Sequence, residues 1–513
     1  MDYITSGNRD QIEFYNLEDV IEKDNGVRVV DAFVDQIDLA KLGFVVNEIK
    51  TEGRPAFNPK VFLKIYLYGY LNGLRSSRKL EKECKRNVEL QWLICKLVPN
   101  YHSIADFRKV NGIALRNTFK LFVLFLKDVD LVAGKTIAID GTKVRAHNSK
   151  KNNFSPKKIE RHLQYIEEKT NEYLKQLDNN DISEDVIKVT KVQEKIERLK
   201  VNKIKYEVLK QKLENSGQPQ ISTTDEDARA LLVQGQVVEV SYNMQAAVDE
   251  KHKLVVATHT INRNDRNALS KIALEAKANL QAKKITAISD KGYHNGKELE
   301  ECRANDITTI CAQQIIVNSN AKGTTPDYLV THFIYNKQED TYTCPQGETL
   351  TTTGTWHKKT RERDSHQFKK YRTPACKTCP VKSLCTGRVQ GGREIDRSEF
   401  AEAVEENSKR YKENPALYRT RQEINEHIFG TIKRQWGYNH TNLKGLEKVN
   451  GEMALIMTVY NMKRTMNILG VENLIEKIKN WEPDYKRIAR PFSKPTFFEA
   501  ICDTQNFQLK IAA

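Results

Sequence analysis

The 513-residue sequence has no apolar run that approaches the roughly 20 residues needed to span a membrane as a helix. Its first residues, Met1–Gly7, lack the basic start and apolar core of a secretory signal peptide. We therefore expect a cytoplasmic protein with no membrane partner. With 39% hydrophobic residues, a chain of this length is able to bury a large core and to form more than one domain.

Acidic residues are too few to balance the basic ones. The chain has 83 Lys and Arg residues against 67 Asp and Glu residues, a formal net charge of +16. A strongly basic balance favours a polyanionic partner, and nucleic acid is the leading class because the chain has no membrane-surface signature. A merely basic soluble protein is the alternative, and charge alone does not decide between the two.

The nine cysteines are an odd number, and in a cytoplasmic protein they do not predict a disulfide framework. Four of them cluster and include one Cys-x-x-Cys pair, a pattern that suits a structural tetrahedral zinc ion. Few large apolar residues surround them, so a metal would help this region to fold. Four free thiols are the alternative. The clustered residues are Cys344, Cys376, Cys379 and Cys385.

Three acidic residues form a candidate site for divalent cations. Asp140 ends an alternating apolar stretch, Thr136–Asp140, which predicts a strand. Asp290 follows a second predicted strand, and Glu426 lies in a predicted helix over 419–436. Two metal ions held by carboxylates can serve both ends of an in-line phosphodiester cleavage. Mg²⁺, or Mn²⁺ in its place, prefers such oxygen ligands, so the three acids together predict a site that cuts DNA.

Each acid also has an ordinary structural explanation. Asp140 precedes a glycine and is suited to a turn, and Asp290 is suited to the start of the next segment. Glu426 resembles any exposed helix acid, and Glu423, one turn earlier, competes with it as the third ligand. Taken singly, these explanations are the stronger ones. The order of the predicted elements favours the combined site.

That order is a strand, a long excursion, a hairpin of two strands, a helix, a strand, a helix and a strand. It predicts a mixed α/β sheet whose first three strands are antiparallel and whose later strands are parallel, the layout of the RNase H-like fold. The predicted hairpin strands are Tyr242–Asp249 and Leu254–Ile261, and the later strands are Ile285–Ser289 and Ile307–Cys311.

Segments outside the predicted sheet suggest further domains. A helical N-terminal domain with interleaved basic residues, among them Arg75 and Arg78, is a candidate DNA reader, or else an ordinary helical domain with a solvated basic face. Heptad-like spacing predicts a helical hairpin inserted after the first strand. The expected divisions are 1–130 (helical), 131–153 (catalytic), 154–220 (hairpin), 221–315 (catalytic), 316–400 (Cys-rich insertion), 401–480 (glutamate helix and following helices) and 481–513 (tail).

Several of these stretches resemble bacterial insertion-sequence transposases of the DDE class. The resemblance is carried by Ala138–Lys143, Tyr242–Asp249, Ser289–Tyr293 and Glu426–Lys433, and by the N-terminal stretch from Arg54–Pro59 to Asp106–Arg108. It covers most of the chain except the predicted hairpin. Similar transposases also carry a cysteine-bearing insertion before the glutamate helix.

The resemblance implies a catalytic triad of Asp140, Asp290 and Glu426. Lys433 stands seven positions after the glutamate, where the family has a lysine. A lysine at this position is able to hold the DNA backbone as a point charge. The expected arginine position falls on Gln422, so Arg421 as a phosphate contact departs from the family spacing by one residue.

Two residues after the glutamate block combine a cation and an aromatic ring. Arg434 and Trp436 suit the binding of unpaired nucleotides. Core packing is the alternative role for Trp436, and it is the commoner role of large aromatic residues.

The resemblance implies a transposase that binds the inverted-repeat ends of its element. It would hydrolyse DNA strands there with Mg²⁺ and attack target double-stranded DNA with the freed 3′-hydroxyl. Pairing two ends implies a homodimer or a larger assembly. The alternatives are a nuclease of the same fold without strand transfer and a catalytically inactive, domesticated DNA-binding protein.

Overall fold

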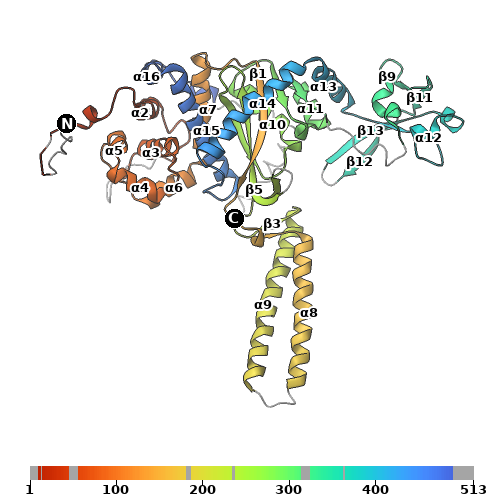
Figure 1. Ribbon diagram of the computed structural model, residues 1–513, viewed down its shortest axis with the longest axis horizontal. Helices are drawn as coiled ribbons and strands as arrows, with labels where there is room; N and C mark the ends of the chain where they lie inside the picture. The colour runs from red at the N-terminus through yellow and green to blue at the C-terminus, as the bar shows by residue number, and fades with distance from the viewer. Residues whose placement is uncertain are drawn as a thin grey trace, which may run out of the picture.

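The computed structural model describes residues 10–12, 14–45, 56–180, 186–233, 237–313, 324–361 and 364–488. Arg54 and Pro55 of the N-terminal stretch, Cys502 and the tail from residue 489 onward lie outside the described residues. Figure 1 shows a long body made of helices and a central sheet, with one helical hairpin projecting from its middle. Within the described part of the chain, no helix is long and apolar enough to cross a membrane.

The central sheet has the mixed topology that the sequence predicts, with one further strand, Arg229–Val233, that it does not predict. Strand β1 pairs antiparallel with β5 and parallel with β7, while β5 pairs antiparallel with β6 and β7 pairs parallel with β8. The strand order is β4-β5-β1-β7-β8, with β6 also on β5. The six strands are β1 (Thr136–Arg145), β4 (Arg229–Val233), β5 (Val237–Asp249), β6 (Val255–Ile261), β7 (Ile285–Ser289) and β8 (Ile307–Cys311).

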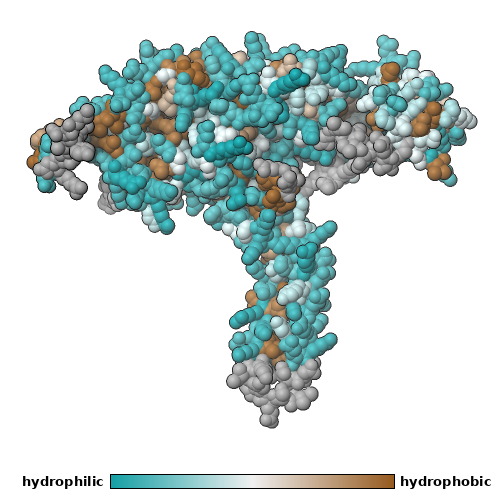
Figure 2. Space-filling view, viewed as in Figure 1, coloured by the Kyte–Doolittle hydropathy of each residue, from teal (hydrophilic) through white to brown (hydrophobic). Residues whose placement is uncertain are grey.

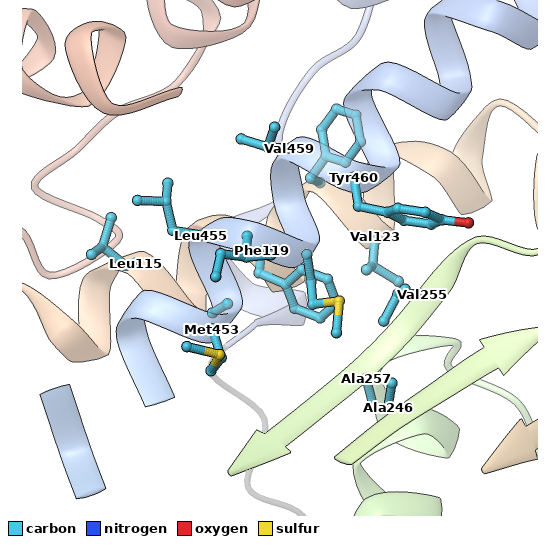
Figure 3. Close-up of a cluster of buried hydrophobic side chains, with 14 of the residues drawn as sticks. Leu115, Phe119, Val123, Ala246, Val255, Ala257, Met453, Leu455, Val459 and Tyr460 are labelled. Carbon is cyan, nitrogen blue, oxygen red and sulfur yellow. The ribbon is translucent and has the colours of Figure 1, made fainter. Parts of the chain in front are cut away.

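One helix, α15 (Leu446–Leu469), is buried along most of its length and ties the sheet to the N-terminal helices. Its side chains meet α7 (Gly112–Asp128) on one side and β6 on another, as Figure 3 shows for Phe119, Met453 and Val255. A helix that is apolar on nearly every face can be stable only inside a core. Helices α10 (Leu269–Asn279) and α11 (Gly296–Ala304) complete the layer around β6 to β8.

The N-terminal domain is helical, as expected. A buried ion pair joins it to the rest of the body, because Arg75 Nη2 lies 2.8 Å from Glu452 Oε1 on α15. Its helices are α1 (Leu17–Val20), α2 (Val27–Gln36), α3 (Pro59–Leu71), α4 (Ser77–Arg86), α5 (Val88–Leu93) and α6 (Tyr101–Val110).

The predicted helical hairpin is formed by α8 (Pro156–Asn180) and α9 (Val186–Ser216), and short strands β2 (Asn153–Phe154) and β3 (Ile221–Ser222) close its base. Ile159, Leu209 and Leu213 are buried between the helices near the base. Figure 2 shows that the face of the hairpin in view is mostly polar, with separate apolar spots. The hairpin therefore has its own small core and projects away from the sheet.

The cysteine-bearing insertion contains a second sheet, which the sequence did not predict. Its strand order is β12-β13-β11-β10-β9, with β14 on β13. A separate small core holds it together, formed by Phe333, Tyr342, Leu350, Tyr371 and Ile395. The elements are β9 (Ile334–Asn336), β10 (Thr341–Thr343), β11 (Thr349–Thr352), β12 (His357–Arg361), β13 (Asp364–Arg372), α12 (Lys382–Cys385) and β14 (Ile395–Ser398).

Three helices follow or flank this insertion in the main body. Helix α13 (Ala401–Glu413) packs on α11 and β8, and α14 (Pro415–Gly430) lies across β1, β5 and β7. One π-helical turn, Thr431–Gln435, continues α14. Helix α16 (Val471–Lys479) packs on α2. Helix α14 is the element that covers the predicted acidic site.

Candidate active site

The structure places Asp140 and Asp290 side by side. Ile139 of β1 is in register with Ser289 of the parallel strand β7, and the two aspartates are the next residues along each chain. Asp140 accepts a hydrogen bond from Gly141 N at 2.8 Å. Asp290 accepts one from Gly292 N at 2.8 Å and so caps a short 3₁₀ turn. Both aspartates thus stand where the pairing of β1 with β7 ends, although β1 itself continues to Arg145.

Burial raises the pKa of Asp140 to about 6. The Gly141 N–H and the Arg421 guanidinium oppose this shift, whereas the neighbouring charges of Asp290 and Asp265 add to it. Arg421 Nη1 lies 3.6 Å from Asp140 Oδ2, and the Asp140 side chain keeps 31% of its exposure. This carboxylate is therefore charged at neutral pH at some cost and is open to a cation.

Helix α14 starts with Pro415 in its first turn, where proline has no hydrogen bond to lose. Ile424 and Ile428 are buried beneath the helix, and Arg421 on the same side reaches Asp140. The sequence placed Arg421 one residue away from the family position, and the structure nevertheless brings it to the acidic pair.

The two glutamates considered for the third ligand point elsewhere. Glu426 is exposed and accepts a hydrogen bond from Gln422 Nε2 at 2.7 Å. Glu423 is 71% exposed, and its ion pair with Lys253 at 2.5 Å lowers the pKa of its carboxyl. Among the described residues, no group of three or more His, Cys, Asp or Glu side chains is arranged to hold a metal ion. The structure therefore assembles the aspartate pair without a third carboxylate from α14.

Asn425 occupies the inner face of α14 instead. Only 1% of this residue is exposed, and neither Oδ1 nor Nδ2 of its amide has a hydrogen-bond partner in the described part of the structure. It stands one helical turn after Arg421 and so shares that residue's face. Its inward position was not predicted from the sequence. A polar residue among Ile424, Ile428 and Ile432, which share one helix face, is the signal that could have found it.

Asp265 is a second residue that the sequence analysis missed as part of this region. Its carboxylate pairs with Lys143 Nζ at 2.9 Å and accepts hydrogen bonds from Asn243 Nδ2 at 2.7 Å and Gln245 Nε2 at 2.9 Å. Despite its burial, these partners lower the pKa of Asp265. Three donors leave this carboxylate little capacity for another ligand.

Gly141 makes this arrangement possible. A Cβ at this position would lie 2.2 Å from Gln245 Nε2 and 2.7 Å from Asp265 Oδ1. A glycine inside a strand often marks such a close approach, and Gly141 directly after Asp140 was the available signal. Any side chain here would push the Asp265 network away from the strand.

The basic residues predicted to contact DNA divide into exposed and internal ones. Lys433 is half-buried and donates to Thr142 Oγ1 at 3.1 Å and to the Lys143 carbonyl at 3.0 Å, which holds the end of α14 against β1. Burial lowers the pKa of Lys433. Arg434 and Arg78 are exposed. Trp436 packs edge-on against Tyr438 and is partly buried against the core, which supports its packing role.

Arg75 is not available for a DNA contact in this conformation. It is 7% exposed, its guanidinium pairs with Glu452, and it donates to the His440 carbonyl at 2.6 Å. A buried cation pairs with an internal acid because an unpaired one would be strongly destabilising. Arg75 thus joins the N-terminal domain to α15.

The four clustered cysteines come together in the insertion. All four line one pocket, which Arg393 and Phe333 also border. Burial raises the pKa of the Cys385 thiol, and the other three cysteines add to this effect. All four are free thiols in the structure and partly buried. The sequence cluster is therefore also a cluster in space.

Comparison with known protein families identifies two transposase domains. The family described as "Transposase domain (DUF772)" matches residues 15–110, and the family described as "Transposase DDE domain" matches residues 343–466. No curated protein and no solved structure matches the chain. The second match contains the insertion from Thr343 onward with all four clustered cysteines, together with α14 and most of α15, and the first contains helices α1 to α6. Both matches agree with the resemblance seen in the sequence and support an insertion-sequence DDE transposase.

Proposed function

We propose that this transposase binds the inverted-repeat ends of its insertion sequence, cleaves DNA there and joins the 3′-hydroxyl to target DNA. The observation that carries the proposal is the pair of Asp140, inside β1, and Asp290, just after the adjacent parallel strand β7, covered by the helix of the DDE domain. The mixed sheet and its strand order support an RNase H-like catalytic domain.

Asp140 and Asp290 would hold the divalent cation, Mg²⁺ or Mn²⁺, on which DDE domains generally depend. Such a cation activates a water or hydroxyl nucleophile and stabilises the leaving oxygen. The fit is supported by an acid pair at the sheet edge and by a carboxylate, Asp140, whose nearest positive group is 3.6 Å away. Glu426 is the third carboxylate that the resemblance implies, and in this role it stays a proposal.

Positive groups on α14 and after it would hold the DNA. Arg421 lies beside Asp140, where it would meet the phosphate next to the scissile bond. Arg434 is exposed just after the π-helical turn, and Lys433 reinforces the positive charge of this edge. Arg78 on α4 would add a contact to the double-stranded end from the N-terminal domain. A homodimer would pair the two ends, and the projecting hairpin is available for that assembly.

The experiment is an in vitro strand-transfer assay with labelled DNA that carries the flanking repeats, with Mg²⁺ or Mn²⁺ present. We expect joined products from the wild type, and none from Asp140→Asn or Asp290→Asn. Cleavage without joining would favour a nuclease of the same fold. Specific end binding without cleavage under either metal would favour a domesticated DNA-binding protein and would contradict the proposal.

We also propose a structural zinc ion held by Cys344, Cys376, Cys379 and Cys385. Support comes from the four thiols lining one pocket beside a small core, although no three of them are arranged as metal ligands in the structure as described. Metal analysis of the purified full-length protein should find one zinc per chain, absent from Cys379→Ser and kept in Cys95→Ser, an exposed cysteine outside the cluster. Four freely reactive thiols with no bound zinc would support the free-thiol alternative.

A further inference from the structure

A buried hydrogen bond crosses strand β1 directly behind the two aspartates. In the central sheet β1 lies between β5 and β7, and Gln245 of β5 is in register with Gly141 of β1. Tyr293, three residues after Asp290 on the far side of β1, donates its hydroxyl hydrogen bond to Gln245 Oε1. Both side chains are 0% exposed. The bond runs on the face of β1 opposite the Asp140 side chain, because side chains alternate along a strand.

Gly141 leaves the space through which Gln245 crosses the strand. A Cβ on Gly141 would lie 2.2 Å from Gln245 Nε2. This Nε2 donates to Asp265 at 2.9 Å, and Asp265 is itself held by Asn243 and Lys143. An amide that is bonded through both its oxygen and its nitrogen is fixed in one orientation. The acceptor offered to Tyr293 therefore has a defined position relative to the Gly141 backbone.

The other end of the bond holds the short turn that carries Asp290. Asp290 caps the 3₁₀ turn Lys291–Tyr293 by accepting from Gly292 N at 2.8 Å. Tyr293 N donates to the Asp290 carbonyl at 3.2 Å, which closes the same turn. A turn of three residues that is tied at its last residue has little freedom to move. The position of Asp290 relative to β1 thus depends on the bond between Tyr293 and Gln245.

We propose that Tyr293 and Gln245 are positioning residues that set the separation of the Asp140 and Asp290 carboxylates. They act through the Gly141 backbone and the turn after β7, and neither is a ligand of the cation. Mg²⁺ demands near-ideal geometry from its oxygen ligands, so a small displacement of one carboxylate weakens binding. Loss of a group that orients a metal ligand typically lowers affinity by about 10–100-fold. This inference rests on the proposed function of the two aspartates.

The test compares Tyr293→Phe with Tyr66→Phe in the full-length protein. Tyr66 is a matched control, because it is also 0% exposed and its hydroxyl donates to a neutral oxygen, the Ile104 carbonyl, at 2.6 Å in the N-terminal domain. The metal-free melting temperatures of the two variants should fall by similar amounts, since each loses one buried hydrogen bond. Mn²⁺ binding, measured by electron paramagnetic resonance, should weaken about 10-fold in Tyr293→Phe and less than about 2-fold in Tyr66→Phe.

A double variant separates positioning from stability. Tyr293→Phe combined with Gln245→Met leaves no unpaired polar atom at the crossing, so its melting temperature should recover relative to Tyr293→Phe alone. The link between the turn and β1 is still missing, so Mn²⁺ binding should stay weak, and the spectrum of bound Mn²⁺ should differ from that of the wild type. If Tyr293→Phe fails to fold, the double variant decides: wild-type Mn²⁺ affinity in it would contradict the inference.

Three other results would overturn the inference: Tyr293→Phe binding Mn²⁺ like the wild type, an equal loss of binding in Tyr66→Phe, or binding that recovers together with the melting temperature in the double variant. Asp140→Asn and Asp290→Asn distinguish this inference from the proposed function. If these two variants lose binding while Tyr293→Phe keeps it, only the positioning role fails. If they bind Mn²⁺ like the wild type, the proposed site itself fails.

Discussion

The acidic residues on the two sides of strand β1 differ in the number of donors that contact their carboxylates. Asp140 and Thr142 face α14, and Gly141 and Lys143 face the opposite side, because side chains alternate along a strand. On the second side, Asp265 receives one ammonium and two amide donors. On the first, Asp140 has one backbone donor and an arginine at 3.6 Å.

We infer from this difference that Asp265 serves the fold and that Asp140 serves the proposed site. A buried carboxylate whose lone pairs are occupied stabilises the fold, whereas one with free capacity is costly unless a ligand binds. Charge and burial alone do not separate Asp265 from Asp140, because both are partly buried acids at the same sheet edge. The number of donors separates them. The predictions below test this contrast.

The largest expected effect is on the α14 side. Asp140→Asn and Asp290→Asn should each reduce strand cleavage and joining by at least about 1,000-fold, because removing an essential catalytic group has effects of this order. Asparagine keeps an oxygen that can accept the Gly141 or Gly292 N–H, so the melting temperature should not fall. Activity is measured with labelled repeat ends, and stability by calorimetry. A fall in the melting temperature of Asp140→Asn or Asp290→Asn as large as that of Asp265→Ala would contradict the difference between the two sides of β1.

The opposite side should show the reverse behaviour. Asp265→Ala should destabilise the protein by about 2–3 kcal/mol, because it leaves the Lys143 ammonium and two amide donors without their acceptor. Lys143→Met in the same chain should restore part of that loss, and a double-mutant cycle of melting temperatures measures the coupling. Additive effects of the two substitutions would show that the ion pair contributes little.

Acid should weaken the same side through His259, which lies opposite Gln245 on β6. Burial lowers the pKa of His259 to about 3, and the cations Lys271, Arg116 and Arg263 add to this shift. Below about pH 6.5 the His259 side chain is protonated in the unfolded chain but stays neutral in the folded chain. The contribution of His259 to the free energy of unfolding is therefore complete above about pH 6.5 and falls as the pH drops.

We expect a loss of about 1–2 kcal/mol between pH 6.5 and pH 5 from this residue. His259→Gln should remove that part of the pH dependence, which melting temperatures across the range would detect. His102, an exposed histidine with the same substitution, is the matched control. An unchanged profile in His259→Gln would mean that His259 is protonated at little cost.

The smallest expected effect concerns Arg421. Arg421→Gln should weaken binding of the repeat ends by about 10-fold and reduce the salt dependence by about one phosphate contact. Arg419→Gln, on the outer face of the same helix, should change binding less. Fluorescence anisotropy at several salt concentrations measures both. Equal effects of the two variants would mean that the arginine beside Asp140 has no special position on the DNA.

Much of the sheet could be predicted from the sequence, because its signals are local. Alternating apolar residues predicted β1, and short apolar runs predicted β7 and β8. The observed bounds of β7 and β8 match the predicted ones. The antiparallel and parallel pairings followed from the order of the elements. Asp290 was found because it directly follows β7. Asp140 was expected to end its strand, but β1 continues to Arg145 through its pairing with β5, so Asp140 lies inside the strand.

The second sheet in the insertion could not be predicted in this way. Its strands are short, and β9 and β10 have three residues each, too few for a clear alternation. The π-helical turn after α14 was also missed, because the apolar pattern continues through it from Ile428 to Ile432. In both cases long-range packing decides what the local pattern leaves open.

The sequence by itself indicated the resemblance to transposases, the strands that place the two aspartates and the cluster of four cysteines. These depend on motifs and on periodicity, which the chain carries wherever it folds. Only the tertiary structure decided that Arg75 is internal, that Asp265 is closed by three donors and that Asn425 faces inward while Glu426 does not. Successive residues of a helix differ by about 100° in direction. The packing of the helix against the sheet, and not the local sequence alone, therefore decides which of two adjacent residues faces inward.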